Sequence, residues 1–252
     1  MPRYPSRSSS PYSSSFSFGP GPISTALKVL IAANVATFFL TALVRPLTPL
    51  LGLSPAAVVS QFYVWQIVTY MFLHGGIFHI VFNMLALWMF GAELERIWGT
   101  RFFLRFYVAT GAGAAATTVI VALLPFSFAQ PVWYSLTVGA SGAIYGLLLA
   151  YAMYFPDRPI YMYLLFPIPA KYFVLIMGGI AFFSSVSDTN GGVAHATHLG
   201  GLLVAYLFLK GGRLHPLAEI KYRYMKWKIG RARKKFDVYS GGRANEWNRR
   251  VH

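Results

Sequence analysis

The feature that most constrains how this chain can fold is a series of long apolar runs. Six of them lie at about residues 23–44, 76–94, 102–124, 141–155, 172–186 and 193–209. A helix rises about 1.5 Å per residue, so about 20 apolar residues span the ~30 Å hydrocarbon core of a bilayer. The chain is 56% hydrophobic and 12% charged, with a mean hydropathy of +0.51, which exceeds what a soluble domain carries. We therefore expect an all-α, polytopic membrane protein with six transmembrane helices.

The segment between the first two runs, residues 45–73, is too interrupted to cross the membrane. It contains Pro46, Pro49, Gly52 and Pro55 but remains rich in Leu, Val, Phe and Trp. We expect a long loop lying partly in the membrane interface, with Tyr63, Trp65 and Tyr70 at head-group depth. Residues 125–137 predict an uncharged loop, and residues 161–171 predict a segment that skims the interface.

The two ends of the chain differ from the apolar part. Residues 1–22 are rich in Ser, Pro and Gly and predict a disordered tail; no A-x-A-like cleavage site marks a signal peptide. Residues 210–252 carry thirteen Lys and Arg against three acidic residues, which is +10 of the net +15. A basic tail directly after an apolar helix favours anionic lipid head groups over nucleic acid as its partner. The predicted organisation is a tail, a six-helix domain at 23–209, and a basic cytoplasmic tail.

Basic residues predict the orientation. On one side of the membrane, Arg3, Arg7 and Lys28 lie before or near the start of the first helix; Arg96, Arg101 and Arg105 lie between the second and third; and Arg158 and Lys171 lie between the fourth and fifth. The segments on the other side hold only Arg45 and Asp188. The positive-inside rule then puts both termini in the cytoplasm. The second, fourth and sixth helices enter from the outer face. A prokaryotic plasma membrane is the default location.

The stretch Gly139-Ala140-Ser141-Gly142-Ala143-Ile144-Tyr145-Gly146 puts one hydroxyl where the fourth helix begins. A serine there is either a helix cap, which accepts an orphan backbone N–H, or a nucleophile. Polar groups inside spans are costly and usually face a bundle interior. The segments at 76–94 and 193–209 deliver His79, Asn83, His195 and His198 to the same outer level as Ser141.

These residue types suit acyl transfer. A serine hydroxyl becomes a useful nucleophile when an imidazole takes its proton, and the oxyanion that forms needs preorganised donors. Ser141 with His198 supplies the first pair; the Ser141 N–H with the side chains of His79 and Asn83 supplies the second. Small residues spaced by four, Gly142 with Gly146 and Gly201 with Ala205, let two helices approach closely.

From about residue 27 to residue 210, the chain resembles the rhomboid intramembrane serine proteases. The resemblance rests on Gly139-Ala140-Ser141-Gly142, on His79-x-x-x-Asn83 within residues 74–83, and on Ala196-Thr197-His198-Leu199-Gly200-Gly201. It implies a Ser/His dyad without an acid, with Ser141 as nucleophile, His198 as general base, oxyanion roles for His79 and Asn83, and Tyr145 stacked on the catalytic imidazole. It also implies transmembrane protein substrates, lateral entry beside the helix at 172–186, and no cofactor. The chain departs from many relatives at Trp65-Gln66, where they have Trp-Arg, and at Thr197, where they have Ala before the histidine. Ala194-His195 therefore offers a competing match for the base, and we choose His198 because Gly201 and Ala205 follow it by three and seven residues.

Two other classes of function stay open at this point. One is an inactive rhomboid-like protein that binds transmembrane clients. The other is a metal site or transporter built on His74, His79, His195 and His198, although no carboxylate lies beside them in the apolar interior. The chain has no cysteine, which excludes thiolate ligands and a cysteine nucleophile. His74 predicts a loop hydrogen-bonder, His195 a polar neighbour of the site, and Asp188 a turn residue.

Overall fold

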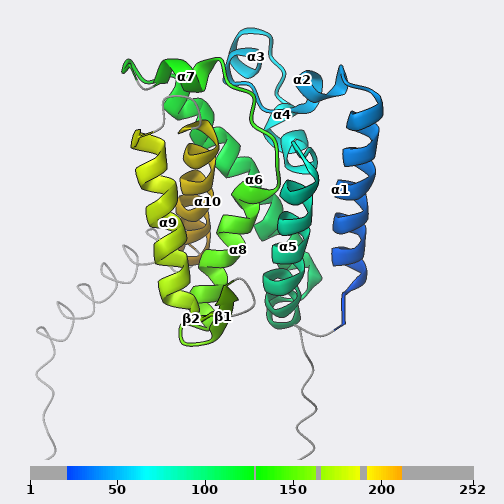
Figure 1. Ribbon diagram of the computed structural model, residues 1–252, viewed down its shortest axis with the longest axis vertical. Helices are drawn as coiled ribbons and strands as arrows, with labels where there is room; N and C mark the ends of the chain where they lie inside the picture. The colour runs from blue at the N-terminus through cyan, green and yellow to red at the C-terminus, as the bar shows by residue number, and fades with distance from the viewer. Residues whose placement is uncertain (1–21, 128, 163–165, 188–191, 212–252) are drawn as a thin grey trace, which may run out of the picture. The chain divides into compact units, whose positions relative to one another are not determined.

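The structure is a computed structural model that describes residues 22–127, 129–162, 166–187 and 192–211. It is helical apart from one small hairpin (Figure 1). The long helices are α1 (Thr25–Leu43), α5 (Ile77–Trp98), α6 (Thr100–Ala122), α8 (Ser141–Tyr154), α9 (Ala170–Ser187) and α10 (Gly192–Gly211). The short elements are α2 (Leu47–Leu51), α3 (Pro55–Ser60), α4 (Gln66–Thr69), η1 (Tyr70–Phe72), α7 (Ala129–Trp133), β1 (Pro159–Met162) and β2 (Phe166–Pro169).

Three helices of the described chain, α1, α5 and α6, are long and apolar enough to cross a membrane, and α8 and α9 contain shorter apolar segments. The chain is therefore a helical membrane protein, and the count of six spans stays a prediction. The six long helices begin and end within about four residues of the predicted runs. The predicted tails at 1–22 and 210–252, and Asp188, lie almost entirely outside the described residues.

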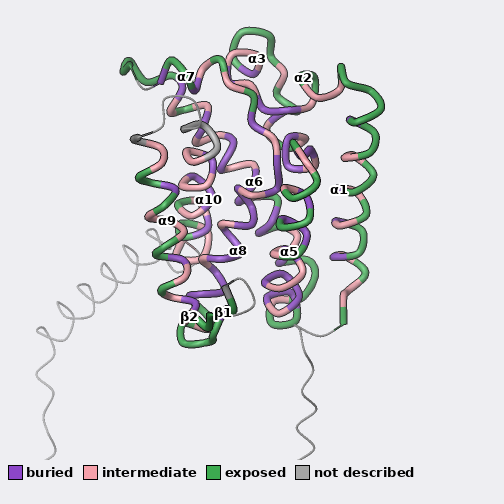
Figure 2. The backbone as a smooth tube through the Cα atoms, in the orientation of Figure 1, coloured by how far each residue is buried: buried purple, intermediate pink, exposed green. Residues whose placement is uncertain are grey.

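Within the compact unit Met1–Leu209, α6 and α8 form the centre of the helix packing. Helix α6 packs against α5 and α8; α1 packs on α5, and α9 packs on α8. Figure 2 shows exposed residues along the outward sides of α1 and α9 and buried residues toward α6 and α8. The exposed side chains of α9 include Leu175, Ile180 and Phe183, as expected of a helix that faces lipid.

Small residues bring the helices around α6 close together. A Cβ added at Gly113 would lie 2.6 Å from a methyl of Val204, and one at Gly200 would lie 3.2 Å from the Ala114 backbone. Such contacts are typical of helix pairs in membranes, where dispersion rather than the hydrophobic effect holds helices together. Glycine therefore decides how α10 meets α6.

The turn between α5 and α6 lies further along the chain than predicted. Helix α5 passes through Glu95 and ends at Trp98, and Gly99, at φ +75°, reverses the chain. Glu95 is only 5% exposed. Its carboxylate accepts hydrogen bonds from the hydroxyls of Ser24 (2.5 Å) and Thr100 (2.6 Å). The helix continues past this acidic residue because hydroxyls from α1 and α6 satisfy it.

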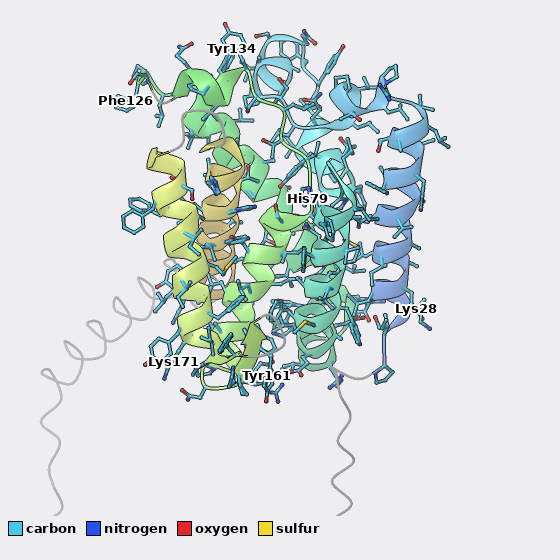
Figure 3. All side chains as sticks on the ribbon, in the orientation of Figure 1. Lys28, His79, Phe126, Tyr134, Tyr161 and Lys171 are labelled. Atoms are coloured by element: carbon cyan, nitrogen blue, oxygen red, sulfur yellow. The ribbon has the colours of Figure 1, made fainter. Side chains whose placement is uncertain are left out.

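The connecting segments hold more regular structure than expected. Residues 45–73 contain α2, α3, α4 and η1, and residues 125–137 contain α7. The segment predicted to skim the interface forms the antiparallel hairpin β1–β2, in which Ile160 pairs with Ile168, so the expected all-α class holds except for this hairpin. Figure 3 shows Lys28, Tyr161 and Lys171 near one end of the helices and Phe126 and Tyr134 near the other.

Candidate active site

A short extended segment leads the chain into α8. Thr137 pairs with Leu53 through two backbone hydrogen bonds, and the N–H of Gly139 donates to the carbonyl of Tyr70 at 2.9 Å. Gly139 has φ +123°, in the region that only glycine adopts easily. A Cβ there would also lie 2.7 Å from Nε2 of His79. Glycine is thus required twice, for the turn and for the approach of His79.

Ser141 is the first residue of α8, not its cap. The N-cap position is Ala140, which makes no side-chain cap bond, so the cap interpretation of Ser141 is wrong. Its hydroxyl instead lies 2.8 Å from Nε2 of His198 on α10. The first backbone N–H groups of a helix have no partner within the helix, so the Ser141 N–H lies where the helix dipole is positive.

The ring of His198 lies against Tyr145, one turn after Ser141. The two rings are parallel, with centroids 4.2 Å apart and an interplanar angle of 6°. His195 contacts His198 edge to face at 5.9 Å. The buried Nδ1 of His198 has no hydrogen-bond partner within the described part of the chain. The imidazole is therefore oriented by the tyrosine ring and the serine hydroxyl rather than by a carboxylate.

The backbones of α8 and α10 touch where these two residues meet. A Cβ added at Gly201 would overlap the carbonyl oxygen of Gly142 and lie 2.9 Å from its carbonyl carbon. A Cβ at Gly142 would lie 2.9 Å from the hydroxyl of Tyr70. Gly142 and Gly146 both pack on α6, where an added Cβ would lie 2.8 Å from Cβ of Ala114 and 2.9 Å from Cβ of Thr110, respectively. The two glycines expected on one face of α8 thus face α6 together, and Gly142 also contacts α10.

His79 approaches the turn before Ser141. Its Nδ1 accepts a long hydrogen bond from the N–H of Gly75, at 3.4 Å. This places the ring proton on Nε2, the atom that a Cβ at Gly139 would meet. Asn83 donates from its side-chain nitrogen to the His79 carbonyl at 2.7 Å, and its buried Oδ1 has no partner in the described residues. The Asn83 amide is thus engaged with its own helix.

His74 lies next to His79, in the segment before α5. It is 7% exposed and contacts His79 edge to face at 5.1 Å. Burial and, as a lesser cause, the nearby His79 lower the pKa of His74 to about 4. Neutral imidazole is the form that a buried site without an acidic partner favours. His74 lies in the loop, as predicted, and its side chain is buried there.

Tyr70 is buried as well, although we expected it at head-group depth. Its side chain is 0% exposed, and its hydroxyl donates to the Gly111 carbonyl at 2.7 Å. Burial raises the pKa of this hydroxyl, with Tyr107 as a lesser cause. Tyr70 joins η1 to α6 and supports the chain on both sides of the Ser141 turn. An aromatic residue in a proline-rich loop gave no signal of this role.

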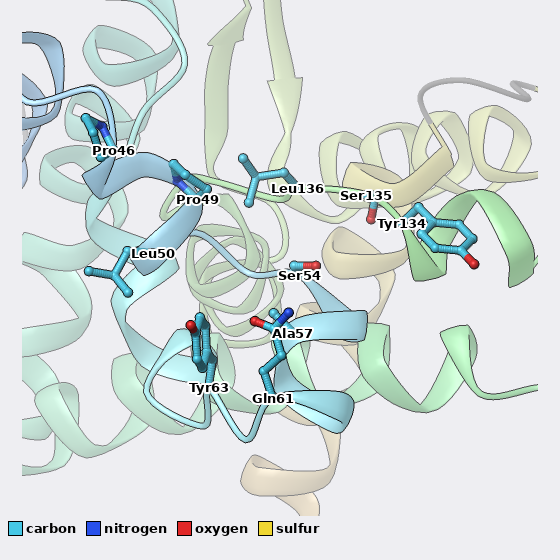
Figure 4. Close-up of a pocket in the computed structure, with 10 residues that line it drawn as sticks. All are labelled: Pro46, Pro49, Leu50, Ser54, Ala57, Gln61, Tyr63, Tyr134, Ser135 and Leu136. Atoms are coloured by element: carbon cyan, nitrogen blue, oxygen red, sulfur yellow. The ribbon is translucent and has the colours of Figure 1, made fainter.

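The described residues form no metal centre, and one pocket lies apart from the predicted site residues. In the described ranges, no three His, Cys, Asp or Glu side chains gather as a metal site requires. A pocket of about 460 Å³ opens between the α2–α3 loop and the segment before α8 (Figure 4). It is lined by Pro46, Pro49, Leu50, Ser54, Ala57, Gln61, Tyr63, Tyr134, Ser135 and Leu136. None of the predicted site residues lines it.

A model of the Rhomboid domain matches residues 61–212. The chain belongs to the rhomboid family. Rhomboid protease GluP of Bacillus subtilis (strain 168) is 31% identical over 152 residues, which are 60% of this chain and 27% of the relative. Rhomboid protein 1, mitochondrial, of Saccharomyces cerevisiae (strain ATCC 204508 / S288c) is 30% identical over 139 residues, 54% of this chain and 38% of the relative. Rhomboid protease AarA of Providencia stuartii is 28% identical over 151 residues, which are 57% of this chain and 54% of the relative.

The matched part spans less than two thirds of the length of each of these relatives. With three apolar helices long enough to cross a bilayer, this rhomboid is an integral membrane protein. The match covers every residue singled out for the site, from His74 to Gly201.

Gln66, one of the two departures noted in the sequence, is buried in the loop between α1 and α5. It is 0% exposed, and its amide nitrogen donates to the carbonyls of Pro49 (3.0 Å) and Leu50 (3.2 Å). Its Oε1 accepts from the N–H of Ser54 at 3.0 Å. A neutral amide therefore holds together the loop between α1 and α5 in this rhomboid.

Proposed function

We propose that this protein is an intramembrane serine endopeptidase that cleaves peptide bonds in or near transmembrane segments of other membrane proteins. The observation that carries the proposal is the 2.8 Å contact between Ser141 Oγ and His198 Nε2, made at the start of a helix with Tyr145 stacked on the imidazole. Nucleophile, base and orienting group have the arrangement that covalent catalysis requires. The protease names among its rhomboid relatives support the same reaction.

In this mechanism Ser141 Oγ attacks the scissile carbonyl carbon while His198 Nε2 takes the hydroxyl proton. The protonated imidazole then donates that proton to the leaving amine as the C–N bond breaks, which leaves an acyl-enzyme. Water, deprotonated by His198, attacks the ester carbonyl, and the imidazolium returns that proton to Ser141 Oγ as the acyl C–O bond breaks, which releases the carboxylic acid product and restores both residues. No carboxylate is needed, because Tyr145 orients the ring and Nδ1 keeps its proton throughout.

The oxyanion is stabilised by donors on two helices. The Ser141 N–H at the start of α8 points into the region of positive helix potential. His79 supplies its Nε2–H, since Nδ1 accepts from Gly75. Asn83 fixes His79 through the bond to its carbonyl and supplies its second amide hydrogen. Removal of one such donor costs about 10²–10³ in kcat in a serine protease.

The proposed topology has six spans, both termini in the cytoplasm, and the site toward the outer face of a prokaryotic plasma membrane. Lys28 and Lys171 near one end of the helices (Figure 3), with Arg158 beside the hairpin, support a cytoplasmic assignment of that end. Substrate enters laterally past α9 and unwinds locally, because a helix hides its carbonyls in i to i−4 bonds. A disulfide engineered between α9 and α5 should block cleavage, and full cleavage by the locked form would refute this gate.

The test is cleavage of a model transmembrane substrate by purified protein in detergent, together with labelling by a fluorophosphonate. Ser141→Ala should lose both cleavage and labelling. The matched control is Ser185→Ala, because Ser185 is on α9 and its hydroxyl donates to the Phe182 carbonyl of its own helix at 2.7 Å; it should behave as wild type. If Ser141→Ala equals wild type in cleavage, the proposal fails. Absence of cleavage and labelling in the wild type would favour an inactive protein that binds transmembrane clients.

A further inference from the structure

A hydroxyl pair deep in the helix bundle joins α6 to α10 directly beside the candidate base. Thr118 Oγ1 and Thr197 Oγ1 lie 2.8 Å apart, and the two residues are 0% and 1% exposed. We propose that this bond makes Thr197 a positioning residue, which fixes the rotation of α10 so that His198 stays in line with Ser141. The inference rests on the proposed function.

The glycine contacts of α10 near this point fix its distance from its neighbours but not its rotation, and the contacts of His198 with Ser141 and Tyr145 are the ones that the rotation must preserve. Gly200 lies against the Ala114 backbone and the Cβ of Thr117, and Gly201 lies against the Gly142 carbonyl. Glycine surfaces are smooth, and dispersion contacts have no preferred direction. A hydrogen bond does have one, since it weakens steeply when its angle or length changes. The threonine pair therefore supplies the directional restraint that the glycine contacts lack.

Neighbouring residues on a helix point about 100° apart. Thr197 can therefore face Thr118 on α6 while His198 faces Ser141 on α8. The tip of a side chain lies about 5–6 Å from the helix axis, so a rotation of ~10° moves the imidazole nitrogen by about 1 Å. A misplacement of that size costs up to about 10²-fold in rate. Small rotations of α10 thus matter for the 2.8 Å contact between His198 and Ser141.

Thr197 has a second contact that its methyl group provides. A Cβ at Gly142 would lie 3.2 Å from Cγ2 of Thr197, so the methyl group packs beside the residue that follows Ser141. Valine keeps this methyl and the side-chain shape but has no hydroxyl. Serine keeps the hydroxyl but has no methyl. The two substitutions separate the hydrogen bond from the packing.

The experiment uses full-length protein in detergent and measures kcat and KM on the model substrate, the fluorophosphonate labelling rate of Ser141, and the melting temperature. We expect Thr197→Val and Thr118→Val each to lower kcat and the labelling rate about 10-fold with KM unchanged. The double variant should be no worse than either single variant. Thr197→Ser should recover most of the rate.

The matched control is Thr117→Val. Thr117 is also on α6 and also packs on α10, at Gly200. Its hydroxyl donates within its own helix to the Gly113 carbonyl at 2.8 Å, as the Thr118 hydroxyl does to the Ala114 carbonyl at 3.0 Å. Thr117→Val thus removes the same kind of intrahelical bond as Thr118→Val and leaves the contact between Thr118 and Thr197 in place. This variant should keep the wild-type rate. The inference is overturned if Thr197→Val labels as fast as Thr117→Val, if Thr197→Ser is as slow as Thr197→Val, or if the loss lies in KM alone. These results leave the Ser141→Ala test untouched, so the two proposals fail separately.

Discussion

Adding a single methyl group at Gly201 should separate the two residues of the proposed dyad. A Cβ there would overlap the Gly142 carbonyl oxygen and lie 2.9 Å from the carbonyl carbon, 0.5 Å short of the 3.4 Å at which ordinary contact begins. Both groups are backbone within helices and cannot rotate away. The overlapping oxygen demands more room than the carbon, so α8 and α10 must part by about 1 Å.

That movement acts directly on the candidate site, because Ser141 adjoins Gly142 and His198 lies one turn before Gly201. The 2.8 Å contact between Ser141 Oγ and His198 Nε2 would lengthen toward 4 Å, beyond hydrogen-bond range. We expect Gly201→Ala to lower the fluorophosphonate labelling rate of Ser141 by about 10²-fold. Overpacking of this kind also costs about 1–3 kcal/mol of stability, which thermal unfolding in detergent measures.

Gly211→Ala is the matched control for Gly201→Ala. It makes the same substitution in the same helix, at a position where an added Cβ meets nothing within 4 Å. It should label at the wild-type rate. If Gly201→Ala also labels at that rate while remaining folded, then close contact between α8 and α10 does not set the reactivity of Ser141, and the reasoning is refuted.

Two further predictions concern stability. Glu95→Ala removes the acceptor of two hydroxyl bonds, one from Ser24 before α1 and one from Thr100 at the start of α6. At about 1.5–3 kcal/mol per bond to a charged group, it should lower the unfolding free energy by about 3–6 kcal/mol. A loss no larger than that of Ser24→Ala would contradict this. Burial lowers the pKa of His74 to about 4, against about 6.5 in an unfolded chain. The unfolded state therefore takes up a proton that the folded state does not as pH falls from about 6.5 to 4, so this part of the stability is complete above that window and lost through it. The melting temperature of wild type should fall more between pH 7 and pH 5 than that of His74→Asn, and equal falls would rule out this role.

The long helices could be predicted from apolar runs because the membrane leaves few alternatives for a polar backbone. Their ends could not be predicted as well. The second apolar run ends at about residue 94, beside Glu93 and Glu95, yet the helix continues to Trp98. Glu95 pairs with hydroxyls, including that of Ser24 71 residues away, and Glu93 pairs with Arg158. Partners so distant in sequence are not visible in a local pattern.

The loop between α1 and α5 shows a different limit. Proline and glycine correctly excluded a span, but they do not reveal how the loop is held. Pro55 begins α3, a position where its missing N–H costs nothing. Gln66 bonds to a carbonyl within the loop, and Tyr70 bonds to a carbonyl of α6. The sequence does not distinguish a buried glutamine or tyrosine from an exposed one. Their roles depend on which carbonyls the folded loop presents.

For the candidate site, sequence could predict residue types and helix ends but not the direction of polar atoms. Spacing by four put His79 and Asn83 on one face of a helix, and the structure adds that the Asn83 nitrogen donates to the His79 carbonyl. Likewise, Thr197 was only a departure from a family pattern, whereas its hydroxyl meets Thr118 across 79 positions of sequence. Both facts concern rotation about bonds and helix axes, which the identity of a residue does not determine. Substitutions that keep shape and remove one polar atom, as Thr197→Val does, are therefore the way to learn what these contacts contribute to catalysis.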